Sequence, residues 1–327
     1  MTAHRDHRCG TARCRPAATP RNDTPGDTPG DTPGDNPGDN PGDNPGDNPG
    51  EGDPMTDPLG LGPALLFCPA DRPERYAKAA QRADAVILDL EDAVAPSAKP
   101  AARDALVVTP LDPARTVVRI NAEDTEDFAH DLVALRHTAY TTVMLPKTAS
   151  AERLAVAAEL GLHRVVALCE TAEGVVNAAE IARAPNVVAL MWGAEDLVAS
   201  LGGSSSRRRD GAYRDVARHA RSTVLLAAGA AGRPAIDAVH VDIADHDGLR
   251  EEALDAVASG FAATACIHPD QVETVRAAYR PDAEELEAAR ELLDAARRAP
   301  GVFTFRGRMV DEPLIRHAER LVRRADA

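Results

Sequence analysis

The sequence predicts an α/β protein in three parts: a disordered N-terminal repeat (residues 1–54), a (β/α)8 TIM barrel (55–281) and a C-terminal helical extension (282–327). Three observations lead to this prediction. A Pro-Gly-Asp repeat fills residues 25–48, eight short apolar runs then alternate with amphipathic segments, and further helical sequence follows the eighth run. Strand–helix alternation is typical of a parallel sheet, and eight units match the number and size of a closed barrel.

The N-terminal repeat consists of Pro-Gly-Asp tetrapeptides that end in Thr or Asn. Such a segment cannot bury apolar surface, and Pro and Gly disfavour regular structure, so we expect disorder. A calcium-binding repeat is the alternative, since Asp and Asn recur. Repeats of that kind also carry an apolar residue that packs a core, and none is present here. Met55 directly follows the repeat and is a candidate for the true start.

We therefore expect residues 1–54 to be dispensable. A chain that starts at Met55 should match the full chain in activity and in melting temperature, as measured by thermal unfolding. A loss of several degrees would show that the repeat packs on the folded part.

The apolar runs of the predicted barrel have the length of buried parallel strands. In chain order they are Ala64–Cys68, Ala85–Leu90, Thr116–Ile120, Thr142–Leu145, Val165–Cys169, Val187–Trp192, Ala235–Val241 and Ala263–Ile267. Amphipathic segments such as Pro73–Arg82, Glu152–Leu160 and Leu249–Ala258 lie between them and predict helices. A doubly wound open sheet is the alternative, but it usually has a glycine-rich turn after its first strand, and Pro69–Pro73 is not one.

The extension begins after Pro281. Ala283–Ala299 predicts a charged helix, Val302–Phe305 a short strand and Glu312–Arg324 a second helix. Because this segment lies beyond eight units, we expect it to cover the barrel or to pack on, or swap with, a neighbouring subunit.

Composition excludes several classes of function. The formal charge of −15 opposes binding to a nucleic-acid backbone, and only 3% of residues are aromatic, which gives little support for base stacking. No apolar run approaches the length of a membrane span, and the N-terminus lacks the apolar stretch of a signal peptide. Five scattered cysteines, three of them in apolar runs, indicate core residues in a reducing compartment, so we expect a cytoplasmic protein.

Polar or ionisable residues follow every predicted strand. This matters because the catalytic groups of a barrel project from the carboxyl ends of its strands. In strand order the residues are Asp71, Arg72 and Arg75; Asp89, Glu91 and Asp92; Arg119 and Asn121; Lys147; Glu170; Glu195 and Asp196; Asp237 and Asp242; and His268.

Glu170 and Asp196 close two successive strands and are the best candidates for a metal site. Carboxylates with few His or Cys neighbours suit a hard cation, and Mg2+ often takes only one or two protein carboxylates. The alternative is that each acid caps or stabilises the start of the helix that follows it.

Arg119 and Lys147 are the candidate cations. Arg119 lies on an apolar run, where its planar fork suits a substrate carboxylate, although an ion pair with Glu91 or Asp92 would also explain it. Lys147 could bind substrate, form a Schiff base or pair with nearby carboxylates. His268 could be catalytic or could bond a backbone group.

Nine ordered stretches resemble one known family. They are LFCPADRPERYAKA, AVILDLEDAVAP, VVRINA, VMLPKTAS, ALCETAEGVVNAAEIA, MWGAEDLVASLG, AIDAVHVDIADHDGLREEA, GFAATACIHPDQVETVRAAY and GRMVDEPLIRHAERLV. They are similar to the citrate lyase β-subunit branch of the HpcH/HpaI aldolase superfamily, which includes malyl-CoA, citramalyl-CoA and citryl-thioester lyases. The resemblance covers about Ala64 to Ala325 and is far more specific than any single motif.

The resemblance implies roles for particular residues. Glu170 and Asp196 correspond to ligands of Mg2+, for which Mn2+ can substitute, and Arg119 to the group that holds the carboxylate of a 2-oxo acid. Asp89, Glu91 and Asp92 fall in an acidic motif near the metal, and we take Glu91 and Asp92 as catalytic candidates. Arg72 and Arg75 fall in the loop that approaches the phosphates of coenzyme A. Asp311 falls in the C-terminal motif that, in relatives, enters the site of the neighbouring subunit.

The implied activity is Mg2+-dependent cleavage or formation of a carbon–carbon bond in a 3-hydroxyacyl-CoA thioester, with an acyl-CoA and a 2-oxo acid as partners of the reaction. A homotrimer or homohexamer is implied as well. The alternatives are an aldolase acting on free hydroxy-oxo acids, a malate-synthase-type or thioesterase activity, and a non-catalytic barrel that binds an acyl thioester. Two departures from the family pattern are Ala70, where glycine is usual, and the SSSRRRDG stretch at 204–211.

Overall fold

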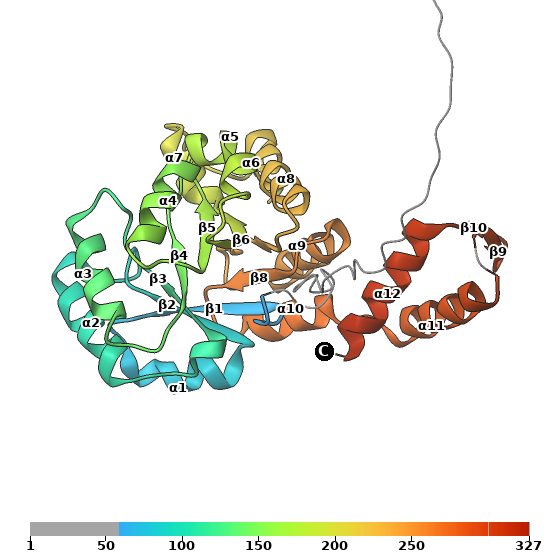
Figure 1. Cartoon of the computed structure of the whole chain (residues 1–327), viewed down its shortest axis with the longest axis horizontal. Coiled ribbons are helices and arrows are strands. Elements are labelled where there is room, and N and C mark those ends of the chain that lie inside the picture. The colour runs from blue at the N-terminus through green and yellow to red at the C-terminus, as the bar shows by residue number, and fades with distance from the viewer. Residues whose placement is uncertain (1–58, 300, 327) are drawn as a thin grey trace, which may run out of the picture. The chain divides into compact units, whose positions relative to one another are not determined.

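The computed structural model describes residues 59–299 and 301–326, so the predicted N-terminal repeat lies outside the described residues. Eight parallel strands pair in chain order and close into a barrel, with β1 also bonded to β8 (Figure 1). The strands are β1 (Ala64–Pro69), β2 (Ala85–Asp89), β3 (Thr116–Arg119), β4 (Thr142–Leu145), β5 (Val165–Cys169), β6 (Val187–Trp192), β7 (Ala235–Asp237) and β8 (Ala263–Cys266). The predicted TIM barrel is confirmed.

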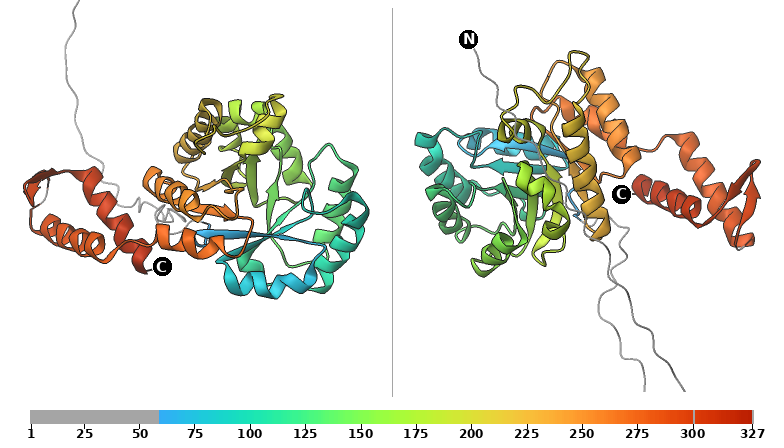
Figure 2. Two further views of the ribbon diagram at one scale, coloured as in Figure 1. Left: turned by 180° about the vertical axis from the view of Figure 1, so that it is seen from behind. Right: turned by 90° about the horizontal axis from the view of Figure 1, so that it is seen from above.

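Helices follow the strands and lie around the outside of the barrel (Figure 2). They are α1 (Pro73–Arg82), α2 (Lys99–Val108), α3 (Glu126–Leu135), α4 (Ala151–Glu159), α5 (Ala172–Val176), α6 (Ala178–Ile181), α7 (Ala194–Ser200), α8 (Asp215–Ala230), α9 (His246–Ser259) and α10 (Gln271–Tyr279), with short 3-10 turns at Pro96–Ala98 and Pro113–Arg115. None of the helices in the described part of the chain is both long and apolar enough to cross a membrane.

Strand residues divide between two apolar layers. Alternate residues such as Ile87, Val117 and Met144 fill the barrel interior, and their neighbours such as Val86 and Val118 pack under the helices. Because both faces are buried, the strands are continuous apolar runs rather than alternating ones. This burial is the reason why the runs could be located from sequence.

Strand β7 is shorter than predicted. The sequence predicts Ala235–Val241, but the strand ends at Asp237. The Asp237 side chain accepts a hydrogen bond from the backbone N–H of Ala238 (3.0 Å), so this N–H does not continue the hydrogen bonding between strands. Beyond it His240 turns toward Glu252, with 2.8 Å between Nδ1 and Oε2.

The extension contains α11 (Ala283–Arg298), a hairpin of β9 (Phe303–Phe305) and β10 (Arg308–Val310), and α12 (Glu312–Asp326). The sequence predicts only the first strand of this hairpin. Its two-residue turn, Arg306–Gly307, has positive φ at both positions (45° and 76°), the backbone of a type I′ turn, and Arg-Gly is a weak signal for such a turn. Helices α11 and α12 share an apolar cluster of their own, which consists of Ala289, Ala318 and Leu321 with Leu292, Leu293 and Val322 against it.

Candidate active site

Arg119 at the end of β3 is held by Asp89 at the end of β2. Its Nε and Nη2 atoms donate to the two carboxylate oxygens of Asp89 at 2.7 and 2.5 Å, a bidentate pair. Asp89 is 1% exposed and also accepts the backbone N–H groups of Glu91 (2.9 Å) and Ala93 (3.1 Å). This carboxylate therefore raises the pKa of Arg119 against the opposing effect of burial, and fixes the guanidinium in one orientation.

The third nitrogen of Arg119 faces Glu91. Nη1 lies 3.0 Å from Glu91 Oε2, although the geometry is not that of a hydrogen bond and Oε2 has no hydrogen-bond partner. Arg119 therefore forms an ion pair with Glu91, which the sequence offered together with Asp92 as a partner. Its main partner, however, is Asp89 and not Asp92. The Nη1 edge is the part of Arg119 that is not committed to Asp89.

Lys147 connects the acidic groups of three strands. Its ammonium pairs with Glu91 Oε1, lies 3.9 Å from Asp92 and 4.0 Å from Asp196, and its backbone N–H donates to Glu170 Oε1 (3.1 Å). The residue has φ of 51°, a conformation that costs energy for a residue with a side chain. The carboxylates raise the pKa of Lys147, with Glu91 making the largest contribution against the opposing effect of burial. A Schiff-base lysine needs a lowered pKa, so the site does not favour that role.

Glu170 directly follows β5, and Asp196 lies in the first turn of α7, just after the neighbouring strand β6. Glu170 is 3% exposed, and burial, followed by the charges of Asp196 and Glu91, raises its pKa to about 8. Burial also raises the pKa of the Glu91 carboxyl, although Arg119 and Lys147 oppose the shift. Three acids therefore crowd together at one edge of the barrel, an arrangement that a bound cation would relieve.

Gly193 lets β6 approach Glu170. A Cβ atom at this glycine would lie 2.8 Å from Glu170 Oε2 and 2.9 Å from Glu170 Cβ, closer than real contacts allow. The residue between Trp192 and the helix that carries Asp196 is thus glycine because the two acidic strand ends pack together.

We expect Gly193→Ala to impair the site, because the added methyl group must displace the Glu170 side chain. Overpacking of this kind costs about 1–3 kcal/mol. The variant should melt several degrees lower and bind divalent cations more weakly, as measured by thermal unfolding and by Mn2+ titration. Gly229→Ala on α8, where a Cβ meets nothing within 4 Å, is the matched control.

Several strand-end residues serve the fold instead. Asp237 accepts Trp192 Nε1 (2.6 Å) and pairs with Arg221 (2.8 Å), and Asn121 donates to Asp131 (2.7 Å) and to the Leu90 carbonyl (3.1 Å). Glu195 accepts the Ser206 hydroxyl (2.5 Å). Asp242 accepts the backbone N–H of Ala244 (3.0 Å), and His268 Nδ1 accepts that of Asp270 (3.3 Å).

The arginines predicted to bind coenzyme A flank the start of α1. The side chains of Arg72 and Arg75 are 54% and 62% exposed, and their ion pairs with Asp71 and Glu74 are long, at 3.7 and 4.0 Å. Asp92 is similarly open, with 60% of its side chain exposed. Because Arg72 and Arg75 are exposed and form only long ion pairs, they can turn toward an anionic ligand beside β1 with little loss of interaction energy.

Ala70 and the 204–211 stretch are ordinary parts of the fold. Ala70 is fully buried and, unlike Lys147 and Arg306 among the described non-glycine residues, has no positive φ. In the 204–211 stretch, Arg207 pairs with Glu252 and lies 3.9 Å from the Tyr213 ring centroid.

Lys99 holds part of the site in place, and the sequence alone did not identify it. Its ammonium is buried and donates to the carbonyls of Leu90 (3.2 Å) and Glu91 (3.3 Å) and to Asn121 Oδ1. It therefore fixes the turn that presents Glu91. No sequence signal distinguishes this lysine on a helix from a solvated one.

Asp311 lies between β10 and α12, and its backbone carbonyl accepts the N–H groups of Leu314 (3.1 Å) and Ile315 (3.2 Å). The side chains of the site described above come from the ends of β2 to β6 and the turns that follow them, whereas Asp311 belongs to the extension, which has its own apolar cluster.

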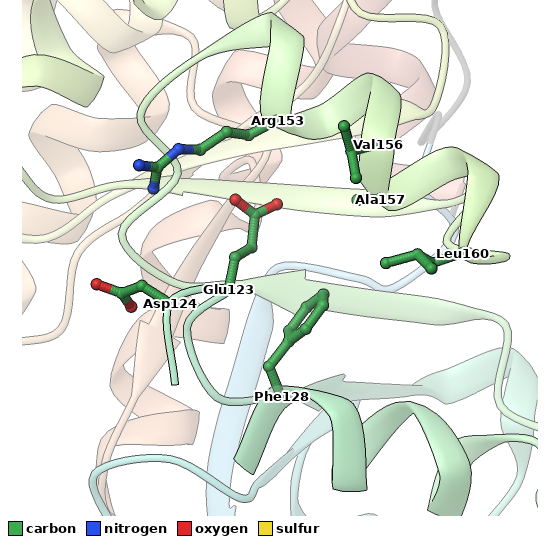
Figure 3. Close-up of a pocket in the computed structure, with 7 residues that line it drawn as sticks. All are labelled: Glu123, Asp124, Phe128, Arg153, Val156, Ala157 and Leu160. Carbon is green, nitrogen blue, oxygen red and sulfur yellow. The ribbon is translucent and has the colours of Figure 1, made fainter. Parts of the chain in front are cut away.

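A groove in the described part of the chain lies away from these residues. It has a volume of about 370 Å3, opens between α3 and α4, and is lined by Glu123, Asp124, Phe128, Arg153, Val156, Ala157 and Leu160 (Figure 3). Figure 3 shows Glu123 and Arg153 reaching toward each other across one end. Burial raises the pKa of Glu123. None of the predicted site residues lines this groove, so the candidate chemistry belongs to the strand ends.

Metal ligands are limited to carboxylates. The described residues contain no group of three or more His, Cys, Asp or Glu side chains arranged to hold a metal. Two carboxylates are nevertheless a donor set that Mg2+ accepts, since it keeps waters and substrate oxygens as its other ligands. Glu170 and Asp196, whose negative charges repel each other, are such a pair.

Comparison with known proteins gives a consistent result. A family model described as HpcH/HpaI aldolase/citrate lyase matches residues 64–269. A Mycobacterium tuberculosis protein named citrate lyase subunit beta-like protein is 65% identical over 264 residues, which cover 81% of this chain and 96% of the relative. A (3S)-malyl-CoA thioesterase of Cereibacter sphaeroides is 35% identical over 276 residues, covering 81% of this chain and 94% of the relative.

A solved structure is also similar. The crystal structure of protein CitE from Mycobacterium tuberculosis in complex with magnesium, acetoacetate and coenzyme A superposes with a TM-score of 0.78 at 63% identity. The match covers 82% of this chain and all of that chain.

Proposed function

Because this chain belongs to the HpcH/HpaI aldolase/citrate lyase family, we propose that it is a CoA ester lyase. It cleaves, or forms, the bond between C2 and C3 of a 3-hydroxyacyl-CoA thioester, with an acyl-CoA and a 2-oxo acid on the other side of the reaction. The single observation that carries the proposal is the cluster at the strand ends, where Arg119, oriented by Asp89, lies beside Glu91, and Lys147 connects Glu91 to Glu170 and Asp196.

Glu170 and Asp196 would hold the divalent cation, Mg2+ or in its place Mn2+. When bound, the cation supplies Lewis-acid polarisation of the oxo-acid carbonyl and stabilises negative charge on that oxygen. The relative of 63% identity that was crystallised with magnesium, acetoacetate and coenzyme A supports this assignment. The donor type in this chain agrees with it, since carboxylate oxygens are the ligands that Mg2+ prefers.

Arg119 positions the oxo-acid part of the substrate. Asp89 holds two of its nitrogens, so the Nη1 edge is oriented before substrate arrives and can receive a carboxylate oxygen. Orientation of this kind contributes to catalysis because little freedom is lost in the transition state. Arg72 and Arg75 provide positive charges for the phosphates of coenzyme A. Lys147 provides a further positive charge beside Glu91.

Two proton transfers complete the cleavage. The substrate hydroxyl gives up its proton as the C2–C3 bond breaks and the bonding electrons move to C2, forming the thioester enolate. We assign the hydroxyl proton to Glu91, the buried carboxylate that lies beside both Arg119 and Lys147, with exposed Asp92 nearby. Asp311 of a neighbouring chain in a homotrimer or homohexamer would protonate C2, or remove that proton in the direction of bond formation.

A thioesterase is the second candidate, because relatives at 35% identity carry that name. In that reaction water attacks the thioester carbonyl, and the sulfur of coenzyme A leaves as the thiol. The same Asp311 would then act as the base for water.

Incubation with malyl-CoA, citramalyl-CoA and citryl-CoA in the presence of Mg2+ tests the proposal. Release of a 2-oxo acid from at least one thioester is expected, as followed with a carbonyl reagent. Cleavage of free hydroxy-oxo acids with no turnover of any thioester would instead identify an aldolase that does not use coenzyme A.

A further inference from the structure

The end of strand β6 lies next to both proposed metal ligands. Trp192 is the last residue of the strand, Gly193 packs directly against Glu170, and Asp196 follows in the first turn of α7. A small shift of Trp192 would therefore move Gly193 against Glu170 and carry Asp196 with it. The contacts that hold Trp192 can therefore influence the placement of both carboxylates.

On one side, a buried ion pair holds Trp192. The indole is fully buried, and its Nε1 donates to Asp237 Oδ1 at 2.6 Å. Asp237, on the neighbouring strand, also accepts from Arg221 Nε (3.0 and 3.1 Å) and Nη2 (2.8 Å). Arg221 extends from α8, and its remaining nitrogen, Nη1, donates a hydrogen bond to Asp255 on α9 (2.6 Å). The strand end is thereby bonded to β7 and, through Asp237, to two surrounding helices.

An aromatic contact holds the other side. Tyr213 meets the Trp192 ring edge-on, with 5.3 Å between centroids and 69° between planes. The guanidinium of Arg207 lies 3.9 Å from the Tyr213 centroid and pairs with Glu252 on α9, with 3.1 Å between Nη2 and Oε2. This fixes the segment before α8 against Trp192.

These groups do not act on substrate. The polar atoms of Asp237 and Arg221 bond to each other, to Trp192, to Asp255 and to the backbone N–H of Ala238, and none of these contacts includes Arg119, Glu170 or Lys147. Stability alone does not explain this ion pair, whose side chains are 16% and 8% exposed, because an ion pair removed from water adds little net stability compared with apolar packing. Mg2+ demands near-ideal octahedral geometry, and partners behind the ligands commonly change metal affinity.

We propose that the β6 brace, defined as Trp192, Tyr213, Arg221 and Asp237, sets the separation of Glu170 and Asp196 and thereby the affinity for the divalent cation. Arg221 and Trp192 are positioning residues. The proposal rests on the metal site of the proposed function, and it adds residues that touch neither metal nor substrate.

Trp192 is itself the probe, because it is the single tryptophan of the chain. Titration of the full-length protein with Mn2+, followed by tryptophan fluorescence, gives a dissociation constant that needs no substrate. Arg221→Ala is expected to weaken Mn2+ binding about tenfold or more, within the range of about 10- to 100-fold typical of groups behind metal ligands. Arg221→Lys keeps the charge but not the fork, and should fall between Arg221→Ala and wild type.

The matched control is Arg218→Ala. Arg218 lies on the same helix, one turn away, with 66% of its side chain exposed and an ion pair to Asp215 as its single ion pair within the described residues. Its variant should bind Mn2+ within twofold of wild type. All titrations are made well below each variant's melting temperature, so that a purely structural loss lowers the melting temperature without changing the dissociation constant.

Trp192→Phe provides a second route that keeps a ring but removes the donor to Asp237. Its Mn2+ affinity is measured from the free-ion signal in electron paramagnetic resonance, and we again expect weaker binding. If Arg221→Lys and Trp192→Phe both fold and bind Mn2+ as tightly as wild type, the brace proposal is overturned while the metal site stands. Wild-type protein that binds no Mn2+ would overturn the brace together with the metal assignment in the proposed function. A wild type that binds Mn2+ but turns over no thioester leaves the brace intact and contradicts only the proposed reaction.

Discussion

Glu170→Gln and Asp196→Asn are each expected to reduce the lyase activity by about a thousandfold or more. Lewis-acid stabilisation is worth several kcal/mol, and about 1.4 kcal/mol corresponds to a tenfold change in rate. Gln and Asn keep the shape of each side chain but remove the negative charge that a divalent cation requires. The measurement is kcat at saturating Mg2+, with circular dichroism to show that the fold is retained.

The stability of Glu170→Gln separates this explanation from unfolding. In the metal-free protein, the pKa of Glu170 is raised from 4.5 to about 8, so the folded state favours the protonated form. The free energy of unfolding of the wild type should therefore decrease as the pH rises from about 4.5 to about 8. Glu170→Gln lacks this decrease and can still accept the N–H of Lys147, so its melting temperature at pH 8 should not fall below that of metal-free wild type.

Full activity in excess EDTA would contradict the metal assignment. Lys147 would then return as a Schiff-base candidate, and borohydride in the presence of substrate should label it. Lys147→Arg keeps the pairing with Glu91 but cannot form a Schiff base, so its activity would show which of the two roles the lysine has.

Asp311→Ala is expected to be inactive alone and to regain activity when mixed with inactive Glu170→Gln chains. If Asp311 completes the site of a neighbouring subunit, subunit exchange creates some sites that contain both Glu170 and Asp311. Action across a boundary agrees with the position of Asp311, which belongs to the extension with its own apolar cluster and not to the strand ends that carry the other site residues. The measurement is the activity of the mixture, with exchange verified by mass-tagged chains.

A simpler role for Asp311 is an acid at the start of α12 that favours the helix dipole, worth about 0.3–1 kcal/mol. In that case Asp311→Ala would remain active and melt slightly lower. Mixtures that stay inactive despite verified exchange would contradict action in trans. Glu312→Ala, one residue away and paired with Arg316 in its own helix, serves as the matched control and should keep activity.

Much of the barrel could be predicted because its strands are buried on both faces. The run Val165–Cys169 has the predicted bounds, and Ala85–Asp89 differs from its prediction by one residue. β7 could not be placed as well, since Ala238–Val241 continues the apolar pattern while the Asp237 side chain ends the ladder. The second strand of the terminal hairpin was missed because Arg306 adopts a left-handed conformation that its residue type does not signal.

The residues of the candidate active site also differ in how well the sequence could predict them. Glu170, Asp196 and Glu91 follow apolar runs and Arg119 lies near the end of one, so their convergence at one edge follows from barrel topology. The partner of Arg119 could not be chosen from sequence, because Asp89, Glu91 and Asp92 are adjacent and only the register of β2 against β3 selects Asp89. Contacts between segments far apart in the chain, such as Lys99 with Asn121 and Trp192 with Asp237, need the folded structure.

Product analysis with and without metal tests the central assignment most directly. The protein is incubated with malyl-CoA, or with whichever thioester it turns over, and the coenzyme A species and free acids are quantified by chromatography. Cleavage of the carbon–carbon bond predicts equal amounts of a shorter acyl-CoA and a 2-oxo acid, present with Mg2+ and absent after EDTA. Free coenzyme A with the intact hydroxy acid, or cleavage that EDTA leaves unchanged, would contradict a metal-dependent lyase at Glu170 and Asp196.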